Sequence, residues 1–290
     1  MKTILRPVLL AAACAVAFPS MAADRCEHSR SEAPALDLSG VTQVRIDIGA
    51  DELVVTAGAP KLSARHCAST PERLANSTLK IERRGSELVL STSTASFANF
   101  NWFADSDYLY REITLALPAD LPLALSLGSG DAAMTGLSSI GIDLGSGDVA
   151  LRQVGRVKAD IGSGDLSVDG ATAVSVAVGS GDAVLKRVQG EVRAEVGSGD
   201  VEMRDVGPIA SLDVGSGGIR AEGVRGDARI GSVGSGGVEL RGVRGRVHVG
   251  GIGSGGVELD GVDGDVTVAD KDAMDGLDTR NVAGRIIVGG

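Results

Sequence analysis

Hydrophobic and polar residues alternate along most of the chain in short segments that turn residues interrupt. In residues 145–161, Val149 and Leu151 alternate with polar side chains, and the alternation resumes after a turn at Val157 and Ile161. Alternation with a period of two indicates half-buried β-strands. Each such unit therefore predicts two short strands joined by turns.

This unit recurs in tandem, and a Gly-Ser-Gly tripeptide marks one turn of each copy. The tripeptide begins at Gly128, Gly145, Gly162, Gly179, Gly197, Gly215, Gly234 and Gly253. Successive copies are 17 to 19 residues apart. Self-similarity at a nearly fixed period is the sequence signature of a repeat architecture.

The apolar positions fall in the same columns in successive copies. The first apolar position after the tripeptide is occupied by Ala132, Val149, Leu166, Ala183, Val201, Ile219, Val238 and Val257. A strand this short cannot bury its apolar face alone, but strands stacked about 4.8 Å apart form continuous apolar ladders. The pattern predicts an all-β fold, a single-stranded parallel β-helix (β-solenoid) with 17 to 19 residues per coil and a flattened or triangular section. A right-handed coil is expected because parallel crossovers are right-handed.

Glycine is expected to shape the corners of each coil. It accepts a positive φ at little steric cost, so stacked corners avoid Cβ clashes. A second set of glycines marks the softer corner: Gly155, Gly190, Gly207, Gly226, Gly245, Gly264 and Gly284. The phosphate-binding motif Gly-x4-Gly-Lys-[Ser/Thr] does not occur. We therefore interpret these glycines as corners rather than as a nucleotide cradle.

The repeats occupy residues 128–290, and residues 24–127 precede them as an N-terminal β capping region. Residues 44–57 mimic a repeat, with Gly49, Ala50 and Asp51 at the corner. We interpret the region as irregular leading coils, with a separate small β domain as the alternative. A helix is expected only near residues 71–76.

The last unit, from Ala273, lacks Gly-Ser-Gly but keeps Leu277, Val282, Ile286 and Val288. It is interpreted as a degenerate final coil. Its open edge would favour aggregation unless something covers it.

The first 23 residues have the organisation of a signal peptide. Lys2 and Arg6 precede an apolar run, residues 8–18, that is too short to span a bilayer. Small residues follow, and cleavage is expected after Ala22 or Ala23. The protein is therefore expected to be exported, either to the periplasm or to the extracellular surface.

The three cysteines add to this picture. Lipidation at Cys14 is disfavoured because Ala11 stands where a lipoprotein signal has a Leu-like residue. Cys26 and Cys67 remain after cleavage. In an oxidising compartment they are expected to form a disulfide, with two free thiols as the alternative.

Charge narrows the range of partners. The chain has 28 Lys and Arg against 38 Asp and Glu, and loss of Lys2 and Arg6 with the leader leaves 26 against 38. An acidic surface disfavours nucleic acid and anionic membranes as partners. No second apolar run approaches the roughly 20 residues of a transmembrane helix, so no transmembrane segment is expected.

The repeated corners resemble those of the putative adhesin, or head GIN, β-strand-repeat family of exported bacterial proteins. The likeness is carried by residues 44–55, by residues 113–118, and by the corners with Asp in fourth position. It covers nearly the whole mature chain. It implies the solenoid fold and an adhesin-like role, and the family has no established function.

Five aspartates follow Gly-Ser-Gly in successive repeats: Asp131, Asp148, Asp165, Asp182 and Asp200. Stacked carboxylates about 5 Å apart repel each other, by roughly 0.8 kcal/mol per neighbour in water. We interpret them as corner caps that accept N–H bonds. The alternative is a Ca²⁺-binding ladder, although calcium β-rolls use a nine-residue half-turn. No other cofactor is expected.

Six of the seven aromatic residues fall within residues 97–110, the predicted aromatic loop. They are Phe97, Phe100, Trp102, Phe103, Tyr108 and Tyr110. They are interpreted as a hydrophobic lid over the solenoid end, or alternatively as an exposed patch that binds a glycan or a protein. Trp102 is the expected anchor of such a patch.

The sequence contains no recognisable catalytic or zinc-binding constellation. His28, His66 and His248 are scattered, and no Cys-x2-Cys pair occurs. The expected function is non-catalytic: an adhesin-like envelope or surface protein that binds a protein or glycan. The alternatives are a calcium β-roll, a periplasmic envelope-stress or regulatory partner, and, least favoured, a glycan-active enzyme. Self-association through the solenoid ends is also expected.

Overall fold

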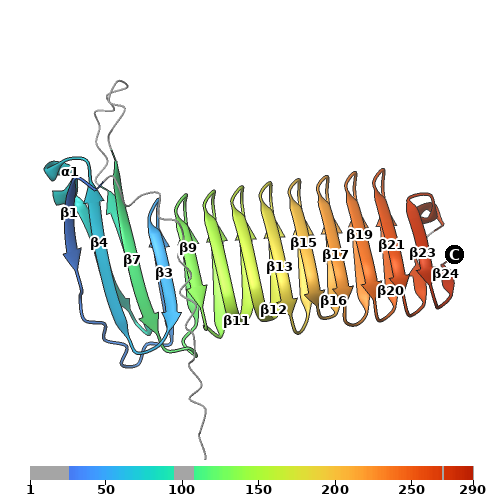
Figure 1. Cartoon of the computed structure of the whole chain (residues 1–290), viewed down its shortest axis with the longest axis horizontal. Coiled ribbons are helices and arrows are strands. Elements are labelled where there is room, and N and C mark those ends of the chain that lie inside the picture. Colours follow the sequence, from blue (N-terminus) through green and yellow to red (C-terminus); the bar gives the residue numbers. More distant parts are fainter. Residues whose placement is uncertain (1–25, 95–107, 270, 290) are drawn as a thin grey trace, which may run out of the picture.

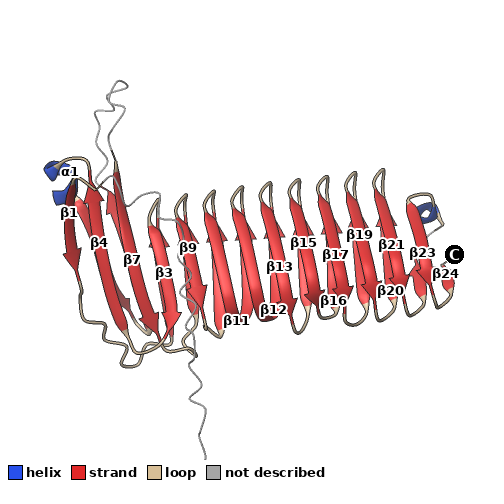
Figure 2. Cartoon of the chain, in the orientation of Figure 1, coloured by secondary structure: helices blue, strands red, loops and turns tan. Residues whose placement is uncertain are grey.

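The computed structural model describes residues 26–94, 108–269 and 271–289. They form an elongated all-β solenoid of about nine turns (Figure 1), which confirms the predicted fold. Each coil contributes one strand to each of two faces, here called sheet A and sheet B. The two helical segments in the described residues lie near the two ends (Figure 2).

Sheet A begins at the N-terminal end with strands that are not in chain order. Its strands, in spatial order, are β1 (His28–Glu32), β4 (Lys61–Ala68), β7 (Leu109–Leu117), β3 (Glu52–Ala57), β9 (Asp131–Thr135), the first part of β11 (Asp148–Ile161), the first part of β12 (Asp165–Val178), β13 (Asp182–Val188), β15 (Asp200–Val206), β17 (Gly218–Val224), β19 (Gly237–Val243), β21 (Gly256–Val262) and β23 (Leu277–Val282).

Sheet B is organised in the same way on the opposite face. Its strands are β5 (Ser77–Arg84), β6 (Glu87–Thr94), β2 (Gln43–Ile48), β8 (Leu123–Leu127), β10 (Ser139–Leu144), the second parts of β11 and β12, β14 (Val192–Val196), β16 (Ile209–Val214), β18 (Ala228–Val233), β20 (Val247–Ile252), β22 (Val266–Val268) and β24 (Ile286–Val288). The predicted helix is confirmed as α1 (Pro71–Ala75), and a 3₁₀ turn, η1 (Asp272–Met274), precedes β23.

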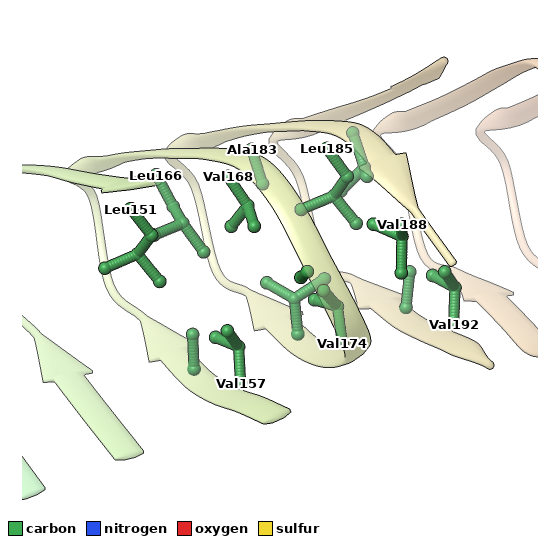
Figure 3. Packing of buried hydrophobic residues seen from close by; sticks show 14 of the residues in the cluster. Leu151, Val157, Leu166, Val168, Val174, Ala183, Leu185, Val188 and Val192 are labelled. Carbon is green, nitrogen blue, oxygen red and sulfur yellow. The ribbon is translucent and has the colours of Figure 1, made fainter. Parts of the chain in front are cut away.

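The predicted apolar columns form the core between the two sheets. In sheet A, Leu151 pairs in parallel with Val168, which pairs with Leu185. In sheet B, Val157 pairs with Val174. These side chains are all buried and point toward the interior (Figure 3). Stacking therefore buries what one coil leaves exposed.

The structure corrects the expected role of the corner glycines. The glycines of the Gly-Ser-Gly corners do not adopt a positive φ. They are needed because coils stack closely: a Cβ at Gly147 would lie 1.6 Å from the carbonyl oxygen of Gly130, and one at Gly155 would lie 2.0 Å from that of Ser138. Within the repeats, the left-handed residues stand elsewhere, just before the second corner: Gly136, Gln153, Gly170, Arg187, Asp205, Gly223, Gly242, Gly261 and Asn281.

The N-terminal strands continue both sheets rather than preceding them in simple order. The coil made by β2 and β3 lies between the β6–β7 coil and the β8–β9 coil. Beyond these coils, β5 pairs antiparallel with β6, β4 pairs antiparallel with β7, and β1 pairs antiparallel with β4. Antiparallel strands thus cover the N-terminal end of the solenoid.

A disulfide between Cys26 and Cys67 joins the start of the described chain to β4, as the sequence predicted. The Cα atoms of the two cysteines are 5.2 Å apart. The bond fixes β1 along the outer edge of the cap, where a terminal strand otherwise frays.

Candidate ligand-binding groove

The five predicted aspartates form one column at the start of the sheet A strands. Asp148, Asp165, Asp182 and Asp200 pair in register from coil to coil. The backbone N–H of Asp148 donates to Oδ1 of Asp131 (3.1 Å), and that of Asp200 donates to Oδ1 of Asp182 (3.0 Å). Each of these carboxylates therefore accepts an N–H from the next coil, whereas the sequence suggested a donor in its own corner.

The column extends further than the sequence indicated. Glu52 on β3 pairs with Asp131 on one side and with Glu112 on β7 on the other. Burial, followed by the charges of Glu112 and Asp131, raises the pKa of Glu52. Burial likewise raises the pKa of Asp148, with the charges of its two neighbours adding to the effect.

Chain order alone does not indicate these two glutamates, because it does not reveal which leading coil lies beside which. The corner at residues 49–51 does carry a sequence signal that Glu52 belongs to the column. Aligned on its first glycine, this corner puts Asp51 opposite Gly130 and Glu52 opposite Asp131. Asp51 is therefore not a member of the column, and the structure buries it.

Toward the C-terminal end the column changes to glycine, and a shallow groove of about 640 Å³ opens over sheet A. Gly218, Gly237 and Gly256 contribute to its floor. A Cβ at Gly237 would meet its nearest neighbour at 3.8 Å, and one at Gly256 at 3.7 Å, which are ordinary contacts. Neither glycine has a positive φ. Stacking therefore does not require glycine at these two positions, although it does at Gly236 and Gly255, where a Cβ would lie 2.0 Å from a carbonyl oxygen.

The lining of the groove is predominantly acidic. Its charged residues are Asp200, Glu202, Arg220, Glu239, Glu258 and Asp278. The single cation among them, Arg220, places Nε 2.6 Å from Oε2 of Glu239, and Arg241 also contacts this carboxylate. Glu202, Glu258 and Asp278 likewise contact arginines: Arg204 pairs with Glu202, and Arg280 lies 3.2 Å from Glu258 and 2.9 Å from Asp278. The groove is therefore lined by carboxylates whose charge neighbouring arginines partly compensate.

The structure places only part of the predicted aromatic loop. Phe97, Phe100, Trp102 and Phe103 lie outside the described residues, so their role stays a prediction. Tyr108 and Tyr110 have ring centroids 6.0 Å apart. The hydroxyl of Tyr108 accepts a hydrogen bond from the backbone N–H of Glu27 at 2.9 Å. Tyr108 thus holds the N-terminal segment beside the disulfide.

A buried ion pair joins β7 to the corner between β2 and β3, and a hydrogen bond from β6 adds to it. Arg111 on β7 places Nη1 3.0 Å from Oδ1 of Asp51, and both side chains are almost fully buried. Thr92 on β6 donates to Oδ2 of Asp51 at 2.6 Å. Because each charge has a partner, this network can fix the β6–β7 coil against the β2–β3 coil without leaving a buried charge unpaired.

His66 contacts a serine and a glutamate, the residue types of a catalytic triad, but the histidine and the serine are buried. Its Nδ1 lies 2.6 Å from the hydroxyl of Ser77, and its Nε2 lies 3.0 Å from Oε1 of Glu32. His66 and Ser77 are both 0% exposed. A nucleophile must reach its substrate, so this trio instead connects β1, β4 and the start of β5.

Within the described ranges, no group of three or more His, Cys, Asp or Glu side chains has the arrangement of a metal site. Among the same residues, no helix is long and apolar enough to cross a membrane.

A family model described as Toastrack DUF4097 matches residues 46–230, more than half of the chain. The chain belongs to the Toastrack DUF4097 family. The match confirms the resemblance to adhesin-like β-strand-repeat proteins that the repeated corners indicated. That family has no established function. No curated protein matches the chain significantly.

Several solved structures are similar to the Toastrack chain over most of their length. A putative adhesin from Bacteroides fragilis NCTC 9343 is 17% identical, with a TM-score of 0.40 over 90% of this chain and 97% of that one. A putative lipid binding protein from Parabacteroides distasonis ATCC 8503 is 15% identical, with a TM-score of 0.46 over 91% and 95%. A putative adhesin from Parabacteroides merdae ATCC 43184 is 10% identical, with a TM-score of 0.41 over 92% and 98%.

Proposed function

We propose that this Toastrack protein is an exported, non-catalytic binding protein of the cell envelope or surface, and that the groove over β15 to β23 holds its ligand. The observation that carries the proposal is the glycine floor. At Gly237 and Gly256 a side chain would fit without a clash, yet none is present. A floor that folding does not require, beneath charged walls, is the feature expected of a ligand site.

The ligand that fits best is an extended, positively charged segment of a protein. The groove crosses five stacked strands. Their four spacings of about 4.8 Å span roughly 20 Å, which is the length of about six extended residues. Asp200, Glu202, Glu258 and Asp278 line it with carboxylates. A cationic segment would compete with Arg204 and Arg280 for the last three of these. Opposite charge increases the rate of encounter and sets specificity, more than it adds affinity.

Export is part of the proposal and rests on the leader at residues 1–23, which lies outside the described residues. The disulfide between Cys26 and Cys67 supports it, since disulfides persist in oxidising compartments. A partner at the cell surface would make the protein adhesin-like. A partner in the periplasm would make it a regulatory component of the envelope.

The test is a binding titration with three fluorescent probes: a Lys peptide of about ten residues, a Glu peptide of the same length, and a neutral chito-oligosaccharide. Of the three probes, we expect only the Lys peptide to bind. Its binding should weaken as the salt concentration rises, because exposed charges are screened. The double variant G237Q/G256Q fills the floor and should weaken binding at least about tenfold.

The control variant is A150Q. Ala150 faces outward on the same sheet but lies outside the groove lining. It should leave binding unchanged, and melting curves should show that all variants fold. If the oligosaccharide binds and the Lys peptide does not, the ligand class is a glycan rather than a cationic segment. Equal binding by G237Q/G256Q would reject the groove.

A further inference from the structure

The C-terminal end of the solenoid exposes apolar side chains. Ile286, Ile287 and Val288 make up β24 and are 44%, 41% and 39% exposed. Ile286 and Val288 continue the columns of Val266 and Val268, which are fully buried. They are exposed because, among the described residues, no strand stacks on β24.

The N-terminal end is organised differently. Its outer strands, β1 and β5, are rich in polar and charged residues, and β5 ends in Glu82, Arg83 and Arg84. Charged edge strands block further strand pairing. The large exposed hydrophobic residues of the described chain are three at the C-terminal end and Val54 on the side of sheet A. A head-to-tail contact would therefore pair an apolar end with a charged one.

The outward side chains of β23 are self-complementary. Asp278 and Arg280 flank Thr279, and in the single chain they contact each other at 2.9 Å. If β23 pairs antiparallel with a second β23 about Thr279, Asp278 of each copy lies opposite Arg280 of the other. Opposite charges directly across an antiparallel pair are favourable.

We infer that two copies of this chain associate through their C-terminal ends, with β23 and β24 each antiparallel to the same strand of the other copy. A two-fold axis perpendicular to the solenoid produces this pairing and closes the assembly as a dimer. The contact places Ile286 and Val288 against a second apolar end and supplies partners for the open strand edges. It meets the groove at one residue, Asp278, which also lines the groove.

The size of this end predicts a weak dimer. One strand of six residues, β23, and one of three, β24, on sheets about 10 Å apart give an end of at most roughly 300–400 Å² per copy. That is about half of the surface that standard stable interfaces bury. We therefore expect a dissociation constant in the micromolar range or weaker.

Sedimentation velocity of the purified chain over roughly 1–300 µM tests the inference. We expect a concentration-dependent shift from monomer to dimer. I287K adds a cation to an edge that must pack against its own copy, and should weaken dimerisation at least about tenfold. The matched control is V54K, because Val54 is also 41% exposed but lies away from the end. It should dimerise like the wild-type chain.

A charge exchange tests the pairing itself. R280D puts a second carboxylate opposite Asp278 of the other copy and should weaken the dimer, and D278R/R280D should restore it. Melting curves identify any variant that fails to fold. A chain that stays monomeric at 300 µM, a dimer that V54K disrupts as much as I287K does, or an R280D variant without effect would overturn the inference. Peptide binding to the groove is measured separately, on the monomer at low concentration, with I287K, which leaves the groove lining unchanged.

Discussion

At the scale of single residues, the aspartate column shows how a repeat tolerates stacked like charges. Asp131, Asp165 and Asp182 offset part of the repulsion because each carboxylate accepts an N–H from the next coil. Burial and the neighbouring charges nevertheless raise the pKa of Asp148. A carboxyl whose folded pKa is raised contributes stability below its unfolded pKa of 3.8, and this stability is lost as pH rises through the folded pKa.

Ionised Asp148 therefore destabilises the fold at neutral pH, and D148N should melt at a slightly higher temperature than wild type at pH 7. The asparagine oxygen can still accept an N–H. Melts in EDTA and in millimolar Ca²⁺ should coincide for both proteins if the carboxylates act as corner caps. A calcium-dependent rise that D148N lacks would instead make the column a set of ligands.

At the scale of elements, the N-terminal cap depends on a buried histidine. His66 on β4 contacts Glu32 on β1 and Ser77 at the start of β5. Burial lowers the pKa of His66 and is the largest effect, while Glu32 acts in the opposite direction and Arg30 and Arg111 lower it further. Folding therefore favours the neutral imidazole.

A lowered histidine pKa makes the unfolded cap bind more protons. The stability that neutral His66 contributes is present above pH 6.5 and is lost as pH falls through the folded pKa. We expect amides of β4 and β5 to exchange faster with solvent at pH 5 than at pH 7.5, after correction for intrinsic rates. H66Q, which cannot titrate, should not show this change. An equal pH response in H66Q would assign the effect to other groups.

At the scale of the whole molecule, the solenoid is nearly one-dimensional. Each coil contacts its two neighbours, and Asp165 pairs with Asp182 one coil later. Stability in such proteins is approximately a sum of repeat and interface contributions. Whole coils should therefore be removable, provided that the register is kept.

Deletion of residues 165–181 joins Gly164 to Asp182 and leaves an intact Gly-Ser-Gly-Asp corner. We expect a β-rich circular dichroism spectrum and a cooperative melt at a modestly lower temperature. Deletion of residues 165–173, about half a coil, breaks every column and should abolish cooperative unfolding. If both deletions behaved alike, neighbouring coils would not control the stability.

Much of the architecture could be predicted from the sequence because it depends on local alternation and on its repetition. The strands of residues 145–161, the columns through Leu151 and Val157, and the final coil at Leu277 all follow from the period. The disulfide between Cys26 and Cys67 followed from the count of cysteines in a chain that was expected to be exported. These features need no knowledge of which distant segments meet.

Tertiary structure alone decided where the N-terminal strands lie and where the groove opens. The insertion of β2 and β3 between later coils brings Glu112 and Glu52 into the aspartate column. Gly236 belongs to the Gly-Ser-Gly tripeptide and Gly237 stands where earlier repeats have Asp, but the sequence does not show why the two positions differ. The difference lies in the neighbouring coil, which sets a carbonyl oxygen 2.0 Å from a Cβ at Gly236 and leaves room for a Cβ at Gly237. Whether a glycine is needed for stacking or keeps a site open is decided by the backbone stacked against it.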